Sequence, residues 1–188
     1  MKLSPQTKIL LYAGNLWYFG EGLLGPLFAV FTQRVGGDVL DITGAWAIYM
    51  VVSGVLIIIV GKLADKWNKE VMMIAGYALN AILTFGYLFV STPAQLFALQ
   101  AAFGVATALA TPTWDALYDK YSGSGKNDGF LWGIADGMPN IVVGIATMIG
   151  GLIVVRFSFS ALFAIMGSIQ VVSTVIQAKI LFVEEEMK

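Results

Sequence analysis

Six long apolar stretches constrain the fold of this chain more than any other feature of its sequence. They cover residues 9–31, 42–60, 71–90, 95–114, 129–155 and 157–178. A helix needs about 20 mostly apolar residues to cross the hydrocarbon core of a bilayer. Strands of a membrane barrel would show alternating segments of about 10 residues, and open strands cannot satisfy their backbone groups in lipid. The sequence therefore predicts an all-α membrane protein with six transmembrane helices.

The charge and the residue composition exclude several classes of protein. Charged residues make up 12% of the chain, whereas a soluble domain carries roughly 25%, so much of the surface is expected to face the lipid bilayer. The net charge of −1 gives no basic field for nucleic acid. The sequence contains no Cys and no His, which removes the thiolate nucleophile and the commonest metal ligand. No cofactor and no metal site are expected.

The positive charges predict an orientation. Of the 11 Lys and Arg residues, nine fall on one side of the predicted membrane and two, Arg34 and Arg156, on the other. Cytoplasmic loops carry the Lys and Arg excess, so both termini are expected in the cytoplasm, in a multi-pass protein of the cell's inner or plasma membrane. The nine residues are Lys2, Lys8, Lys62, Lys66, Lys69, Lys120, Lys126, Lys179 and Lys188.

The loop after the second apolar stretch carries the most specific motif. Residues 61–70 read Gly-Lys-Leu-Ala-Asp-Lys-Trp-Asn-Lys-Glu. This resembles the signature loop of the major facilitator superfamily, Gly-x-Leu-Ala-Asp-Arg/Lys-x-Gly-Arg/Lys-Arg/Lys, in position as well as in residues. Asn68 replaces a Gly, and Asn also tolerates left-handed backbone; Glu70 replaces a basic residue. The matching positions are Gly61, Leu63, Ala64, Asp65, Lys66 and Lys69.

The resemblance implies an architecture. Members of that family have twelve helices in two halves, and each half is a 3+3 inverted repeat. Residues 1–188 are then a single six-helix transmembrane domain, one half of such a fold, with repeats at 1–92 and 93–188. The first and fourth helices, which correspond in the repeat, are both interrupted, at Gly25-Pro26 and at Gly104 with Pro112. Paired interruptions of this kind point to the binding site.

A six-helix half needs a second bundle to move against, and the resemblance implies a parallel homodimer. The second helix of each copy is expected to pack on the fifth helix of the other, through small residues that allow close approach. These are Ser53, Gly54 and Gly61 against Gly133, Gly137 and Gly144.

Glu21 is the sharpest candidate for function. The first helix is expected to run from about residue 8 to 33, which places Glu21 near its middle. An ionised carboxylate in hydrocarbon costs several kcal/mol, so Glu21 must face protein or water. It is a candidate proton carrier, with Trp17 and Tyr18 on the same face. The alternative is a protonated Glu that only packs.

A polar stripe in the fourth stretch predicts a cavity wall. Its residues recur at helical spacing, which a lipid-facing surface would not show. The alternatives are that the Thr hydroxyls bond carbonyls of their own helix and that Asp115 is simply solvated near the interface. The stripe consists of Gln100, Gly104, Thr107, Thr111, Asp115 and Tyr118.

Asp136 is the second acidic residue within an apolar stretch. It lies beside Pro139 and Asn140, and a carboxylate beside a loosened helix suits a gate or a cation site. An ion pair with a cytoplasmic Lys is the alternative. Asn80 and Gln170 are expected to form interhelical hydrogen bonds rather than to bind substrate.

The leading hypothesis is a secondary active transporter of a small solute, driven by protons through Glu21 and acting as a homodimer. No ATP-binding loop motif is present in the sequence. One alternative is a non-transporting subunit that pairs with another half-size protein. The other is an intramembrane enzyme with an Asp115–Asp136 dyad, which no motif supports, so the chain is not expected to be an enzyme.

Overall fold

The computed structural model describes residues 3–123 and 128–183. Within these residues all regular secondary structure is helical, because every backbone group that crosses lipid must be bonded inside its own segment. The α-helices are α1 (Pro5–Leu24), α2 (Leu27–Arg34), α3 (Val39–Ala64), α4 (Lys69–Gly86), α5 (Pro93–Ser122), α6 (Asp128–Arg156) and α7 (Phe159–Ala178). Short 3₁₀ turns η1 (Tyr87–Phe89) and η2 (Lys179–Phe182) extend α4 and α7.

The first predicted helix is not continuous, and this corrects the expectation of one helix over residues 8–33. Helix α1 ends at Leu24, Gly25 takes φ 33°, and α2 starts at Leu27 after Pro26. Proline disfavours helical backbone in the residue before it, and only glycine adopts a positive φ freely. Glu21 therefore lies in the last turn of α1, beside the break, rather than in the middle of a helix.

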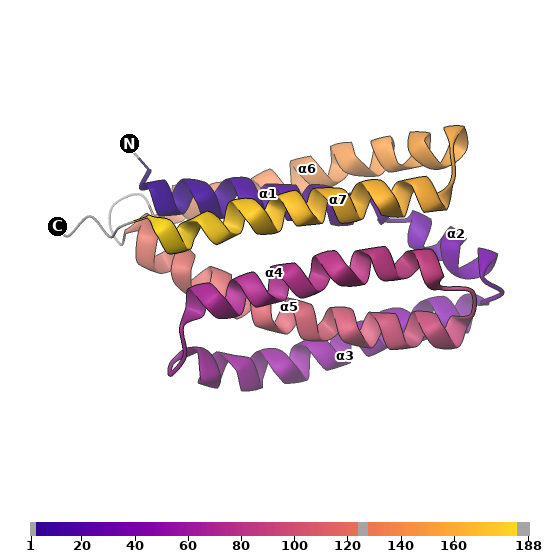
Figure 1. Ribbon diagram of the computed structural model, residues 1–188, viewed down its shortest axis with the longest axis horizontal. Helices are drawn as coiled ribbons and strands as arrows, with labels where there is room; N and C mark the ends of the chain where they lie inside the picture. Colours follow the sequence, from indigo (N-terminus) through magenta and orange to yellow (C-terminus); the bar gives the residue numbers. More distant parts are fainter. Residues whose placement is uncertain (1–2, 124–127, 184–188) are drawn as a thin grey trace.

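Five helical segments of the described residues are long and apolar enough to cross a membrane: Val39–Ala64, Lys69–Phe89, Pro93–Ser122, Asp128–Arg156 and Phe159–Phe182. The sixth predicted span is the one that the Gly25-Pro26 break divides. In Figure 1, α1 and α2 in succession still run the length of the bundle, and α1 begins at the same end at which α7 finishes. The six-span count stays a prediction for that first segment.

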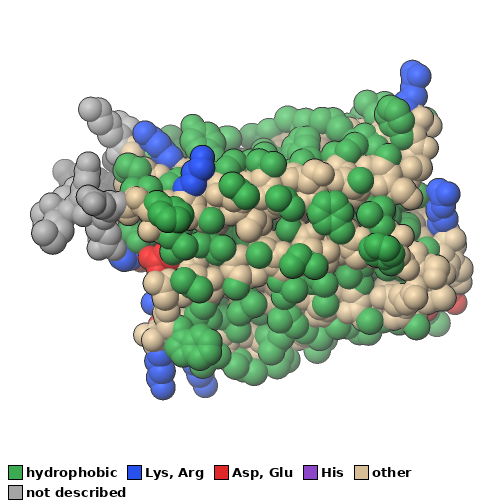
Figure 2. All heavy atoms as spheres, in the orientation of Figure 1, with side chains coloured by type: hydrophobic (Ala, Val, Ile, Leu, Met, Phe, Trp, Pro, Cys, Tyr) green, Lys and Arg blue, Asp and Glu red, His purple; other side chains and the backbone are tan. Residues whose placement is uncertain are grey.

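Positive side chains lie toward the two ends of the bundle, and hydrophobic side chains cover most of the face between them (Figure 2). We call the end where α1 begins the lysine end and the opposite end, with Arg34 and Arg156, the arginine end. Among described residues the lysine end holds Lys8, Lys62, Lys66, Lys69, Lys120 and Lys179. Lys2, Lys126 and Lys188 lie outside the described residues. Which end faces the cytoplasm stays a prediction.

The helices pack in a pattern with internal symmetry. Helix α5 packs against α3 and α4, α1 packs against α6 and α7, and α4 packs against α7. Exchanging α1, α3 and α4 with α5, α6 and α7 leaves this set of neighbours unchanged. An inverted 3+3 repeat would give this pattern; the division at residues 1–92 and 93–188 itself stays a prediction.

Close backbone approach, rather than hydrophobic burial, stabilises the packing of these helices, because lipid tails are as apolar as the side chains. At Gly76 a Cβ would lie 2.7 Å from the backbone N of Ala110, so α4 and α5 meet with no room for a side chain. At Gly150 an added Cβ would overlap the carbonyl oxygen of Leu23 in α1. These contacts set the spacing of the helices around the interior.

Helix α1 is also held by side chains that donate hydrogen bonds to its carbonyl groups. Trp114 Nε1 donates to the Leu10 oxygen at 3.3 Å, and Ser173 Oγ donates to the Ala13 oxygen at 2.8 Å. Thr147 Oγ1 donates to the Gly22 oxygen at 3.0 Å. These bonds come from three different helices, so α1 lies among α5, α6 and α7.

Candidate functional site

Two cavities adjoin in the middle of the bundle. The larger, about 340 Å³, is lined by Trp17, Tyr18, Glu21, Gly22, Leu24, Gly25, Phe28, Trp46, Tyr49, Asn80, Tyr87, Gln100, Phe103, Thr107 and Val143. The smaller, about 160 Å³, is lined by Gly14, Trp17, Tyr18, Tyr49, Tyr77, Thr107, Ala110, Thr111, Trp114, Asp115, Ala135 and Asp136. Trp17, Tyr18, Tyr49 and Thr107 line both cavities. From the positions of their lining residues along the helices, the larger cavity lies toward the arginine end and the smaller cavity toward the lysine end.

Glu21 is held by two side-chain amides from other helices. Its Oε1 accepts hydrogen bonds from Asn80 Nδ2 at 2.9 Å and from Gln170 Nε2 at 3.2 Å. Gln170 Nε2 also donates to the Trp17 carbonyl oxygen at 3.1 Å; this acceptor requires the amide nitrogen, so it sets the orientation of Gln170. The interhelical hydrogen bonds expected of Asn80 and Gln170 are thus present, and their common acceptor is Glu21. One carboxylate oxygen ties α1 to α4 and α7.

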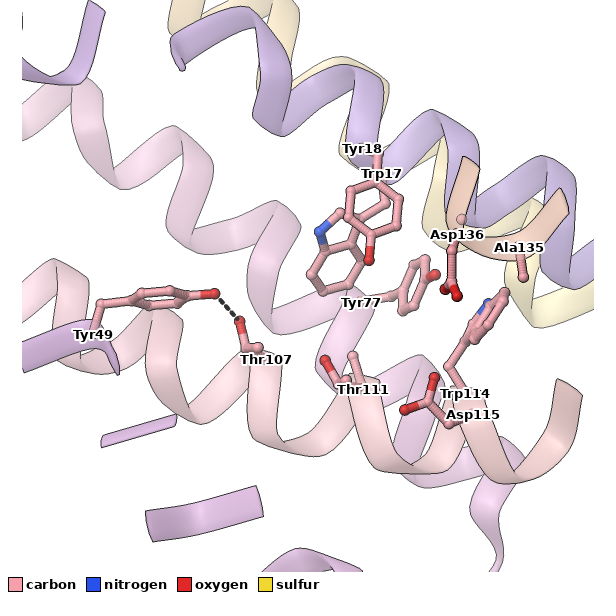
Figure 3. Close-up of a pocket in the computed structure, with 12 residues that line it drawn as sticks. Trp17, Tyr18, Tyr49, Tyr77, Thr107, Thr111, Trp114, Asp115, Ala135 and Asp136 are labelled. Carbon is pink, nitrogen blue, oxygen red and sulfur yellow. Dashed lines mark hydrogen bonds between the residues drawn. The ribbon is translucent and has the colours of Figure 1, made fainter. Parts of the chain in front are cut away.

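A hydrogen bond lies in the wall that the two cavities share. Tyr49 of α3 and Thr107 of α5 bring their hydroxyl oxygens to 3.2 Å (Figure 3). The alternative that the Thr hydroxyls of α5 bond their own helix therefore does not describe Thr107, although it describes Thr113, which donates to Leu109 at 2.6 Å.

Asp115 and Asp136 line the smaller cavity together. They reach it from α5 and α6, close to the ring of Trp114 (Figure 3). Both carboxylates are exposed rather than enclosed by the chain. In the described ranges 3–123 and 128–183 neither has an ion-pair partner, so the ion pair considered for Asp136 is not formed with a described Lys.

The aromatic walls of the smaller cavity are fixed in place. The rings of Trp17 and Tyr77 meet edge to face with centroids 4.2 Å apart. Trp114 stacks on Tyr118 at 4.9 Å with an interplanar angle of 7°, and its Nε1 is bonded to the Leu10 carbonyl. Rings restrained in this way present the same surface to whatever enters the cavity.

The polar stripe of α5 is divided between cavity and packing. Gln100, Thr107, Thr111 and Asp115 line a cavity, and Gln100 Nε2 donates to Tyr87 Oη at 3.0 Å. Gly104 instead packs against α3, where an added Cβ would lie 2.9 Å from Val52 Cγ1. Tyr118 is buried and donates to the Leu131 carbonyl at 2.7 Å.

Asn140, like Gly104 and Tyr118, was predicted to belong to the site but lies apart from both cavities. Its Nδ2 donates to the carbonyl oxygen of Asp136, one turn earlier in α6, at 3.0 Å. Sequence reasoning also missed Tyr49 and Tyr77 as wall residues. A phenol in the middle of an apolar stretch is the signal that could have identified them, because its hydroxyl needs a polar neighbour.

The signature loop lies at the lysine end and connects α3 to α4. Asp65, Lys66 and Asn68 are exposed. Asn68 has φ −67° and caps α4 by accepting a hydrogen bond from the Val71 N–H at 2.8 Å. Tolerance of left-handed backbone is therefore the wrong reason for Asn at this position; its capping ability is the right one. Glu70 accepts a hydrogen bond from Tyr121 Oη at 2.9 Å, which ties α4 to α5.

No group of three or more His, Cys, Asp or Glu side chains among the described residues is arranged to hold a metal ion. The cavities instead combine fixed aromatic rings, hydroxyl groups and carboxylates in a bundle of apolar helices. Such a central polar cavity between helices that can cross a membrane is the arrangement of a membrane transport protein.

Comparison with known proteins gives the family. The model of the Major Facilitator Superfamily matches residues 10–188, so the chain belongs to that superfamily of transporters, and the resemblance of its signature loop is confirmed. It is 23% identical over 175 residues to an uncharacterised MFS-type transporter of Methanocaldococcus jannaschii, covering 93% of this chain and 45% of that protein.

Two further relatives are named multidrug resistance protein MdtG. The one from Enterobacter lignolyticus is 24% identical over 167 residues, covering 86% of this chain and 40% of the relative. The one from Salmonella typhimurium is 23% identical over 167 residues, which cover 86% of this chain and 41% of the relative. The chain thus spans less than half the length of these relatives.

Proposed function

We propose that this chain is one half of a secondary active transporter for a small solute and that Glu21 couples transport to protons. The observation that carries the proposal is the position of Glu21, which lines the larger cavity while its Oε1 is held by Asn80 and Gln170. Glu21 supplies the carboxyl group among the residues that line this cavity, and a carboxyl group can bind and release a proton. Membership of a transporter superfamily supports the transport part of this proposal.

The hydrogen bonds suggest how protonation acts on the helices. A carboxylate accepts both amide N–H groups of Asn80 and Gln170, whereas a protonated carboxyl is a weaker acceptor and carries its own donor. Because these amides belong to α4 and α7, a change at Glu21 alters how α1 is joined to both. The Gly25-Pro26 break in the next turn gives α1 a place to bend.

Glu21→Gln tests the coupling. In proteoliposomes the variant should lose solute uptake driven by an imposed pH gradient and keep exchange of solute across the membrane, because Gln can hydrogen-bond but cannot release a proton. Asp119→Asn removes a carboxylate on exposed α5 surface outside both cavities and should behave like the parent chain. Equal pH-driven uptake by Glu21→Gln and the parent would contradict the role given to Glu21.

We further propose that two parallel copies form the working unit, with α3 of each copy against α6 of the other. The support comes from glycines that pack against nothing in the part of the chain that the structure describes. An added Cβ would meet no atom within 4 Å at Gly54, Gly61, Gly133, Gly137 or Gly144. Glycine costs stability in a helix interior, and in membranes small residues commonly serve helix association.

Ser53 does not belong to this surface, which corrects the earlier expectation. Its side chain is 5% exposed, and its backbone N lies 3.0 Å from where a Cβ on Gly104 would be, so it packs against α5 of its own chain. In the proposed dimer, Asp65 lies near the N-terminus of α6 of the second copy, where the helix dipole favours negative charge. The two Glu21 side chains then face a shared cavity.

Disulfide crosslinking tests the dimer, because the sequence contains no native Cys. Lys62 lies in the last turn of α3 and Gly129 in the first turn of α6, both at the lysine end. Oxidation of a mixture of Lys62→Cys and Gly129→Cys chains in membranes should give a crosslinked dimer that neither variant gives alone. Monomers only, with a monomeric mass in mild detergent and full transport, would refute the dimer.

A further inference from the structure

The smaller cavity has a wall chemistry that selects one kind of ligand. Aromatic rings of Trp17, Tyr18, Tyr77 and Trp114 surround it, and Asp115 and Asp136 supply its charge. None of the residues that line either cavity is Lys or Arg. An anionic solute would meet two carboxylates and no compensating charge.

We propose that this acidic aromatic cavity binds an organic cation through a substituted ammonium group. The inference rests on the proposed transport function and adds the class of solute to it. Faces of Trp and Tyr rings attract a cation through the ring quadrupole, most strongly where water is excluded. A substituted ammonium group has methyl or methylene groups that fit apolar ring surfaces and a charge that suits the two carboxylates.

The restraint of the rings favours binding. Trp114 is fixed by its hydrogen bond to Leu10 and by Tyr118, and Trp17 is fixed against Tyr77. Walls that are already ordered lose little side-chain entropy when a ligand enters, so more of the interaction free energy appears as affinity. The aromatic walls of the cavity are therefore preorganised for binding a cation.

The carboxylates also lack a partner of opposite charge within the described chain. Two carboxylates at one cavity repel each other, and a bound cation relieves that repulsion at both. The larger cavity shares the walls at Trp17, Tyr18, Tyr49 and Thr107, so the uncharged remainder of the solute can extend from the aromatic rings toward Glu21. One solute can therefore occupy both cavities.

A matched pair of probes separates charge from shape. Choline carries a trimethylammonium group, and 3,3-dimethyl-1-butanol has the same shape with a neutral carbon in place of the nitrogen. Binding of each to the full chain in liposomes is measured by quenching of Trp fluorescence and by calorimetry. Choline should bind at least about tenfold more tightly than the neutral alcohol.

Two variants locate the site and one serves as the control. Asp115→Asn and Asp136→Asn should each weaken choline binding by about tenfold and leave binding of the neutral alcohol unchanged. Asp119→Asn makes the same change of charge one turn along α5, outside the cavity, and should bind choline like the parent chain.

Equal affinity for choline and the neutral alcohol, or no binding of choline, would overturn the inference without any variant. Binding of choline by Asp115→Asn and Asp136→Asn at the affinity of Asp119→Asn would overturn it as well. Selective choline binding with no pH-driven uptake of any solute would support the cation site and contradict the proposed transport. Uptake that Glu21→Gln abolishes, without choline binding, would support transport and contradict the cation site.

Discussion

Replacing Gly150 with Ala tests the packing that places α1 beside the cavities. A Cβ at this position would overlap the carbonyl oxygen of Leu23 and lie 2.7 Å from its carbonyl carbon. Backbone atoms cannot move aside as a flexible side chain can, so α6 and α1 would have to separate. Gly151, the next residue, has no atom within 4 Å of an added Cβ, which makes Gly151→Ala the matched control.

Three contributions determine how much the free energies of unfolding of Gly150→Ala and Gly151→Ala should differ. Replacing Gly by Ala inside a helix stabilises it by about 0.5–1 kcal/mol, and this applies equally to both variants. Overpacking at Gly150 costs typically about 1–3 kcal/mol. Separation of the helices also breaks the 3.0 Å hydrogen bond from Thr147 Oγ1 to the Gly22 oxygen, a loss of about 0.5–1.5 kcal/mol. Gly150→Ala should therefore be less stable than Gly151→Ala by about 1.5–4.5 kcal/mol.

Thermal unfolding in mild detergent, followed by fluorescence of the native Trp residues, measures this difference. For a chain of this size 1 kcal/mol corresponds to about 2–4 °C in Tm, so the Tm of Gly150→Ala should fall roughly 3–18 °C below that of Gly151→Ala. A Tm for Gly150→Ala equal to that of Gly151→Ala would show that α6 does not touch the backbone of α1 at Leu23, and the arrangement of the cavities derived from that contact would be wrong.

Three further outcomes are expected. In separate variants, a Cys replacing Lys66 and a Cys replacing Arg34 should react with a membrane-impermeant maleimide from opposite sides of the membrane, and labelling of both from one side would exclude the proposed topology. Asn68→Ala should lower the free energy of unfolding by about 1 kcal/mol and Asn68→Gly by only a few tenths, because both remove the cap of α4 but Gly suits that position; equal losses would count against a capping role. In a double-mutant cycle of thermal stability, Tyr49→Phe and Thr107→Val should show a coupling of about 0.5–1.5 kcal/mol, and simple additivity would mean that their hydroxyls do not bond.

The interrupted first helix shows which part of the fold could be predicted from the sequence and which part could not. The Gly25-Pro26 pair was recognised as an interruption, yet the helix was expected to continue through it. Proline kinks are compatible with a continuous helix when neighbours satisfy the freed carbonyl groups. The positive φ of Gly25 shows that the helix is not continuous here, and this angle cannot be predicted from the residue types alone.

The candidate site was predictable where polar residues stood out in an apolar stretch, either singly or at helical spacing as in the stripe of α5. Glu21 and Asp136 were found because a carboxylate in an apolar stretch requires an explanation. Asn80 and Gln170 were judged to be packing residues, and their hydrogen bonds fit that judgement. That both bonds end on Glu21 depends on the rotation of α4 and α7 about their axes, which amide side chains in the sequence do not reveal.

The sequence by itself determined the membrane class, the five helix spans that follow the first, and the signature loop. Span length and scarcity of charge are properties of each segment alone, since lipid acts on every segment in the same way. Only the tertiary structure decided which side chains share a cavity. Helix α3 is apolar on all sides, so its composition gives no preferred inward face, and Tyr49 reaches Thr107 because α3 packs along α5. That rotation is set by close contacts such as Gly104 against Val52, which join residues far apart in the chain.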